Sequence, residues 1–89
     1  MPVISMFFGL IIRMYFFDTD RHHEPHFHVE YGEFEAVFAI QSGELLVGDL
    51  PTAKRRLVQA WIEIHREDLL ADWRLAVEGK ELFRIDPLK

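Results

Sequence analysis

The sequence predicts a small α+β domain in which an antiparallel meander sheet of four to five strands is followed by two helices packed on one face. Two observations predict this class. Strand-like segments rich in β-branched and aromatic residues fill the first 48 residues. From Thr52 to Glu78 there is neither proline nor glycine, and large apolar residues recur at helical spacing. With 89 residues, the chain is expected to form a single domain, residues 1–89.

Gly9 separates the first two expected strands, Val3 to Phe8 and Leu10 to Phe17. Alternation divides the second strand between two faces, with Ile11, Arg13, Tyr15 and Phe17 on one and Ile12, Met14 and Phe16 on the other. Arg13 is a charge on an otherwise apolar strand, so it needs a partner or a route to solvent. The apolar first strand, if it lies at a sheet edge, favours pairing with another chain, as a homodimer or a heterocomplex.

A polar loop is expected from Asp18 to Pro25, because proline disfavours helix at the residue before it. Two strands follow, His26 to Tyr31 and Phe34 to Ile40, joined as a hairpin by the tight turn Gly32-Glu33. A short strand from Glu44 to Val47 completes the expected sheet.

The helical region carries a stripe of six residues spaced four apart: Leu57, Trp61, His65, Leu69, Trp73 and Val77. A step of four drifts by about 40° around a helix with about 3.6 residues per turn, so a straight helix would carry the stripe halfway round. We therefore expect two helices with a bend near His65 to Glu67, and Gly79 as the residue that ends the second. A last short strand is expected from Leu82 to Ile85.

Composition excludes several classes of protein. The formal net charge of −5 gives no overall basic field for nucleic acid, so any such contact must be local. Without cysteine there is no disulfide and no thiolate metal site, which is consistent with a cytoplasmic protein. The apolar stretch from Met1 to Phe17 lacks a basic start and is interrupted by Gly9 and Arg13. We interpret it as core strands rather than a signal peptide or membrane span.

Four histidines lie within seven residues: His22, His23, His26 and His28. The first two belong to the expected loop, and they receive no role here. His26 and His28 are two apart on a strand, so both leave the same face, and Glu30 continues the row.

This row is compatible with two chemistries. His26 and His28 can act as general base and general acid in metal-free RNA cleavage, with Arg13 or Arg21 stabilising the developing phosphorane. Alternatively, the two histidines can share a divalent metal ion with Glu30 or with a loop carboxylate from Asp18, Asp20 or Glu24. No other cofactor is expected. A third interpretation is that the histidines are only polar surface residues.

The remaining candidates lie in the helical region. Lys54, Arg55 and Arg56 form the only basic run, which is either a solvated face, a phosphate-contacting patch or a dock for an acidic partner. His65 lies in the apolar stripe, so a partly buried, hydrogen-bonded histidine is favoured over a catalytic one. Trp61 and Trp73 are expected in the core rather than at a base-stacking surface.

The strings PVISMFFGLIIRMYFFD, PHFHVEYGEFEAVF, SGELLVGDLP and WIEIHREDLLADW resemble the bacterial family called domain of unknown function 4160, over Met1 to about Leu88. The most specific part is Pro25 to Glu33, and the double histidine His22-His23 departs from the usual pattern. Similar proteins are often encoded beside a small partner of domain of unknown function 2442 type. The resemblance therefore implies a toxin–antitoxin pair with this protein as the toxin, and it matches the motif positions to His26 and His28.

Three functions follow as hypotheses. The first is a nuclease-type toxin that acts on RNA or, alternatively, on DNA. His26 and His28 do acid–base work with Arg13 and Glu30, while Arg21 and Lys54 to Arg56 contact nucleic acid. The second is a non-catalytic protein-binding module of a two-protein complex. The third is a metal-binding protein that uses His26 and His28.

Overall fold

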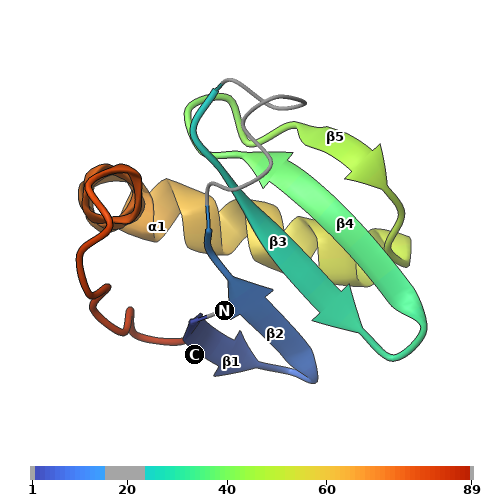
Figure 1. The fold of residues 1–89 in the computed structure, drawn as a ribbon. Coiled ribbons are helices and arrows are strands. Elements are labelled where there is room, and N and C mark those ends of the chain that lie inside the picture. The colour runs from blue at the N-terminus through green and yellow to red at the C-terminus, as the bar shows by residue number, and fades with distance from the viewer. Residues whose placement is uncertain (1, 16–23, 89) are drawn as a thin grey trace.

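The computed structural model describes residues 2–15 and 24–88. Within them, five antiparallel strands form one sheet in the order β1-β2-β3-β4-β5, so the meander is confirmed. A single helix, α1, crosses one face of this sheet (Figure 1). The elements are β1 (Val3–Phe7), β2 (Leu10–Arg13), β3 (His26–Tyr31), β4 (Phe34–Ala39), β5 (Leu45–Gly48) and α1 (Thr52–Val77).

The central hairpin, β3 and β4, has the predicted tight turn. Tyr31 pairs with Phe34 across Gly32 and Glu33, and Phe27 pairs with Phe38. Gly32 has a φ of 55°, which suits the left-handed conformation that such turns use. The hairpin therefore has a defined register, in which Phe27 and Phe38 lie on the same face.

The second strand is shorter than expected, because β2 ends at Arg13. Its predicted alternation is confirmed where the structure describes it, since Ile12 and Met14 are fully buried and Arg13 and Tyr15 are only partly so. Phe16, Phe17 and the loop residues 18–23 lie outside the described residues.

The prediction of two separate helices is wrong, because one helix runs from Thr52 to Val77. The predicted bend is present: His65 has non-helical angles, with φ −114° and ψ 20°. After the kink, Leu69 and Trp73 of the predicted stripe are buried, whereas Val77 at its end is 49% exposed. The part after His65 is seen nearly end-on in Figure 1. The helix ends before Gly79, as predicted. Gly79 has a φ of 72° and directly follows the C-cap residue Glu78.

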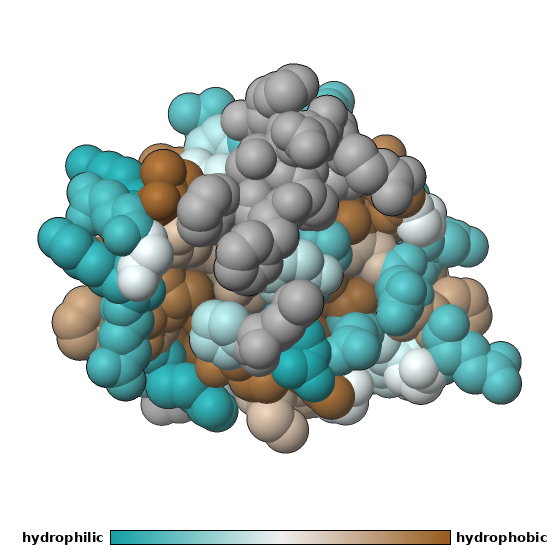
Figure 2. All heavy atoms as spheres, viewed as in Figure 1, coloured by the Kyte–Doolittle hydropathy of each residue, from teal (hydrophilic) through white to brown (hydrophobic). Residues whose placement is uncertain are grey.

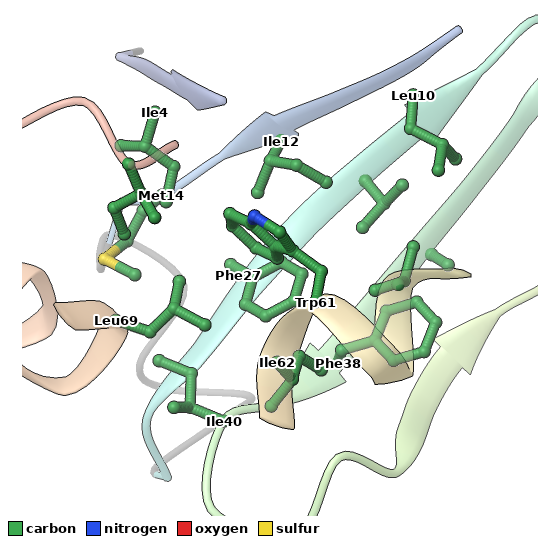
Figure 3. Packing of buried hydrophobic residues seen from close by; sticks show 14 of the residues in the cluster. Ile4, Leu10, Ile12, Met14, Phe27, Phe38, Ile40, Trp61, Ile62 and Leu69 are labelled. Atoms are coloured by element: carbon green, nitrogen blue, oxygen red, sulfur yellow. The ribbon is translucent and has the colours of Figure 1, made fainter. Parts of the chain in front are cut away.

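Trp61 is the centre of the hydrophobic core between α1 and the sheet (Figure 3). Its ring lies 5.2 Å from Phe7 and 5.7 Å from Phe27, measured between ring centroids. The buried Nε1–H donates to the backbone carbonyl of Asp86 at 2.8 Å, so its polar atom is satisfied. Trp73 is also buried, and the expectation that both tryptophans belong to the core is confirmed.

The prediction of a last strand from Leu82 to Ile85 is wrong, because this segment does not form a strand. It is held by isolated bonds instead of a ladder: Ile85 N–H donates to the carbonyl of Ile4 at 2.7 Å. The C-terminal segment thus runs beside β1 (Figure 1). The β1 edge, predicted to pair with another chain, is contacted by the chain's own tail at this point.

Across residues 2–15 and 24–88, no helix is long and apolar enough to cross a membrane.

Gly48 on β5 lies against the backbone of Glu35 and Ala36 on β4, and this close approach predicts an effect on stability. It has a φ of 85°, and an added Cβ would overlap the Glu35 carbonyl oxygen and lie 2.9 Å from Ala36 Cα. Gly79→Ala is the matched control, because its φ is 72° but nothing lies within 4 Å of an added Cβ. Urea unfolding should show a loss of about 1–2 kcal/mol for Gly79→Ala, from backbone strain alone. Gly48→Ala should lose a further 1–3 kcal/mol, roughly, from overpacking. Equal losses would contradict the close approach.

Candidate functional site

The predicted row on β3 lies on the sheet face turned away from the first part of α1. Phe27 and Val29 point into the core, and Phe27 packs edge-on against Trp61. By alternation, His26, His28 and Glu30 occupy the opposite face. Figure 2 views the molecule from this side and shows hydrophilic and apolar residues mixed over the surface. The row predicted from the spacing is therefore present.

His26 is fully buried, so it is not a solvent-exposed polar residue of the strand. Its Nδ1 lies 2.8 Å from the backbone carbonyl of Glu24. A carbonyl can only accept, so Nδ1 carries the proton, and in the neutral ring the lone pair is on Nε2. The imidazole also packs against Trp73, with 4.9 Å between ring centroids. His26 is thus held in one orientation and one tautomer.

His28 lies between two aromatic rings and is partly exposed. It stacks on Tyr15 with the centroids 4.3 Å apart and the planes 12° from parallel. Its other neighbour is His26, whose ring centroid is 5.4 Å away at an angle of 64°. The two histidine rings therefore lie next to each other.

Arg13 has the partner that its position on β2 required. Its Nε donates to Glu30 Oε1 at 2.6 Å, and the two side chains are 33% and 38% exposed. Arg13 is also the residue opposite His28 in the β2–β3 register. The ion pair is partly open to solvent, so it orients the guanidinium more than it stabilises the fold. Four predicted site residues are thus brought together: Arg13, His26, His28 and Glu30.

Two members of this surface were missed by sequence reasoning as site residues. Tyr15 was placed on the same face as Arg13 by alternation, and that signal was enough to include it. Trp73 was assigned only to the core, and it contacts His26 from a distant part of the chain. No local pattern predicts this contact, because it depends on how the bent helix packs.

The metal interpretation needs further ligands besides His26 and His28. Within residues 2–15 and 24–88, no group of three or more His, Asp or Glu side chains is arranged to hold a metal ion. The Glu30 carboxylate is engaged by Arg13. Two loop carboxylates offered as further ligands, Asp18 and Asp20, lie outside the described residues, as do His22 and His23.

The predicted nucleic-acid contacts do not join the histidines. Lys54 donates from Nζ to the carbonyl of Phe8 at 3.2 Å and lies 5.1 Å from the Tyr31 ring centroid. Arg55 pairs with Asp49 at 3.2 Å, and Arg56 is exposed. All three belong to the first turns of α1, which crosses one face of the sheet (Figure 1). Phe27 points to that face and packs on Trp61, so by alternation His28 points to the opposite one. Arg21 lies outside the described residues.

These features define an α+β domain with a pair of histidines on the sheet face turned away from the first part of its helix. The chain belongs to the family described as Domain of unknown function (DUF4160), whose sequence pattern matches residues 9–74. The match covers β2 to β5 and most of α1, and it includes the four clustered site residues and Trp73. The predicted family is therefore confirmed. No curated protein and no solved structure matches the chain significantly.

The tautomer of His26 is a direct test of this geometry. Long-range ¹H–¹⁵N NMR spectra should show a protonated Nδ1 for His26 near neutral pH, because the Glu24 carbonyl accepts from that atom. The spectra of His26→Ala assign the signal. A neutral His26 ring that is protonated only on Nε2 would contradict the contact with Glu24.

Proposed function

We propose that this protein is the toxin component of a bacterial type II toxin–antitoxin pair and that it cleaves RNA without a metal ion. The observation that carries the proposal is the ring contact between His26 and His28, 5.4 Å between centroids, beside Arg13. The resemblance to the family supplies the toxin–antitoxin context.

The chemistry needs two proton transfers and one cation. RNA carries its own nucleophile, the 2′-hydroxyl, which attacks the adjacent phosphorus once a base removes its proton. The 5′ oxygen leaves when an acid protonates it, and a cation stabilises the charge on the phosphorane. We assign the first contact with substrate to His28, which is partly exposed, and the cationic role to Arg13, oriented by Glu30.

His26 is assigned the second proton transfer through Nε2. Its Nδ1 is held by the Glu24 carbonyl, an arrangement that sets the basic nitrogen of many catalytic histidines. His26 is fully buried, so this role requires substrate binding to uncover its ring. Arg56, exposed on α1, and Arg21 are the basic residues we assign to more distant phosphate contacts.

The partner proposed from the resemblance is a small antitoxin of domain of unknown function 2442 type. We propose that it covers the outer faces of β2 and β3 and so blocks His28. A location in the cytoplasm, where RNA and such partners meet, remains our expectation.

The second candidate function is a non-catalytic protein-binding module. It is favoured by the engagement of three predicted cations: Arg13 with Glu30, Lys54 with Phe8 and Tyr31, and Arg55 with Asp49. A net charge of −5 also suits a protein surface better than a phosphate backbone. Under this alternative the same sheet face is an interface, and His28 and Tyr15 contribute contact area.

Induction of the protein in bacteria without its partner separates these functions. Wild-type protein should arrest growth, and His28→Ala should restore it, because the acid–base group in contact with substrate is lost. Glu44→Gln, an exposed change outside the histidine row, is the control and should arrest growth like the wild type.

Each outcome of this experiment is informative if soluble, folded protein is verified by circular dichroism. Normal growth with wild-type protein overturns the toxin proposal. Arrest by both wild type and His28→Ala overturns the acid–base mechanism and favours toxicity through binding.

The metal alternative makes a separate prediction. Metal analysis of tag-free protein purified without chelator should find no stoichiometric zinc, manganese or nickel. One metal ion per chain that disappears in the His26→Ala, His28→Ala double variant would replace metal-free cleavage with a metal site.

A further inference from the structure

A second candidate site lies away from the histidine row, between the later part of α1 and the C-terminal segment. It is a cavity of about 280 Å³, close to the lower end of the range for small-ligand pockets. Its walls include Asp68 and Asp72 from the helix and Phe83, Arg84 and Asp86 from the tail. None of these residues belongs to the surface proposed for RNA cleavage.

Asp72 is the unusual member of this cavity, because it is a carboxylate only 2% exposed. Its Oδ1 accepts a hydrogen bond from the backbone N–H of Phe83 at 3.0 Å. Its Oδ2 is buried and has no hydrogen-bond partner among the described residues. Burying a carboxylate oxygen without a hydrogen-bond donor costs free energy. A donor or a positive charge beside Oδ2 would therefore stabilise Asp72.

The charges around the cavity also favour a cation. Burial raises the pKa of Asp72 and outweighs the lowering effect of the Phe83 N–H, while the nearby Asp68 raises this pKa to a lesser extent. Asp68 and Asp72 are four residues apart on one helix, so they share a face. Asp86 adds a third carboxylate to the walls, against one fixed cation, Arg84, and the titratable His65. The balance of charge in the cavity is negative.

The rest of the lining suits an alkyl cation better than a bare ion. Phe83 is 73% exposed, unusually high for an aromatic residue, and its ring can receive a cation on its face. Ala71 and Ile85 supply an apolar wall for a hydrocarbon stem. A metal ion would need more oxygen or nitrogen ligands, and no group of three or more such side chains is arranged for one in the described part of the chain.

We propose that this cavity binds an organic cation, a primary ammonium or guanidinium group on a short alkyl chain, which pairs with the carboxylates of Asp72 and Asp68. The apolar stem lies along Phe83 and Ile85. The same chemistry exists in a free amine and in a lysine or arginine side chain of a peptide, and the test distinguishes these sources.

Binding should weaken as the pH falls. The cation requires ionised Asp72, and a raised pKa means that this group takes up its proton at a higher pH than an ordinary aspartate. The other titratable groups on the walls act in the same direction: protonation of Asp68 or Asp86 removes negative charge, and protonation of His65 adds positive charge. Arg84 stays charged throughout.

The experiment is an NMR titration of ¹⁵N-labelled full-length protein with n-butylammonium, with n-butanol as the neutral probe of similar size. We expect saturable shifts of the amides of Asp72, Phe83 and Ile85 with the ammonium, and none with the alcohol. Capped peptides containing one lysine or one arginine form the second arm. Binding of a peptide at least tenfold tighter than the amine assigns the site to a protein side chain, and the reverse assigns it to a free amine.

The decisive variant is Asp72→Asn, which keeps a carbonyl oxygen for the Phe83 N–H but removes the charge. It should weaken ammonium binding at least tenfold, whereas Glu33→Gln, an equal loss of charge in the exposed β3–β4 turn, should not. If Asp72→Asn does not fold, Asp68→Asn replaces it, because the Asp68 side chain is 70% exposed. Unchanged affinity in the folded variant, or equal shifts with the alcohol and the ammonium, overturns the proposal.

Discussion

The structure depends on the packing of one face of β3 against Trp61. Phe27 and Val29 are buried on that face, and a slip of one residue in the strand register would exchange them for His26 and His28. Such a slip would place two imidazoles in the hydrophobic core, where unpaired polar groups are costly. The core contact and the tight turn after Tyr31 therefore determine that the histidines lie on the outer face, beside the side chains of β2.

The bend of α1 at His65 is the second determinant, and both candidate sites lie next to the part of the helix that follows it. Before the bend, the helix covers the core face of the sheet; after it, Trp73 contacts His26 and Asp72 lines the cavity. Asp72 and Trp73, which are adjacent on the helix, thus belong to two separate candidate sites. A straight helix with the same sequence would carry its apolar stripe away from the sheet, which is the physical reason that the drift in spacing predicted a bend.

Patterns within short stretches of the sequence predicted the features that depend on neighbouring residues. Strand alternation gave the meander, the buried pair Ile12 and Met14, and the row that holds His28. The contact of Trp73 with His26 and the cavity around Asp72 could not be predicted, because each joins segments far apart in the chain. The number of helices was wrong for a related reason: one helix runs through the non-helical angles of His65, and the apolar spacing indicates a bend without distinguishing a kink from a break.

We propose above all that His26 and His28 perform metal-free acid–base chemistry on RNA. The most direct measurement is cleavage of a short single-stranded RNA by purified protein in the presence of a chelator, with analysis of the product ends. Wild-type protein should release products ending in a 2′,3′-cyclic phosphate, and folded His28→Gln should release at least a hundredfold less, because general acid–base catalysis contributes about 10²–10⁴-fold. Intact RNA with folded wild-type protein, or equal cleavage by His28→Gln, would contradict the account.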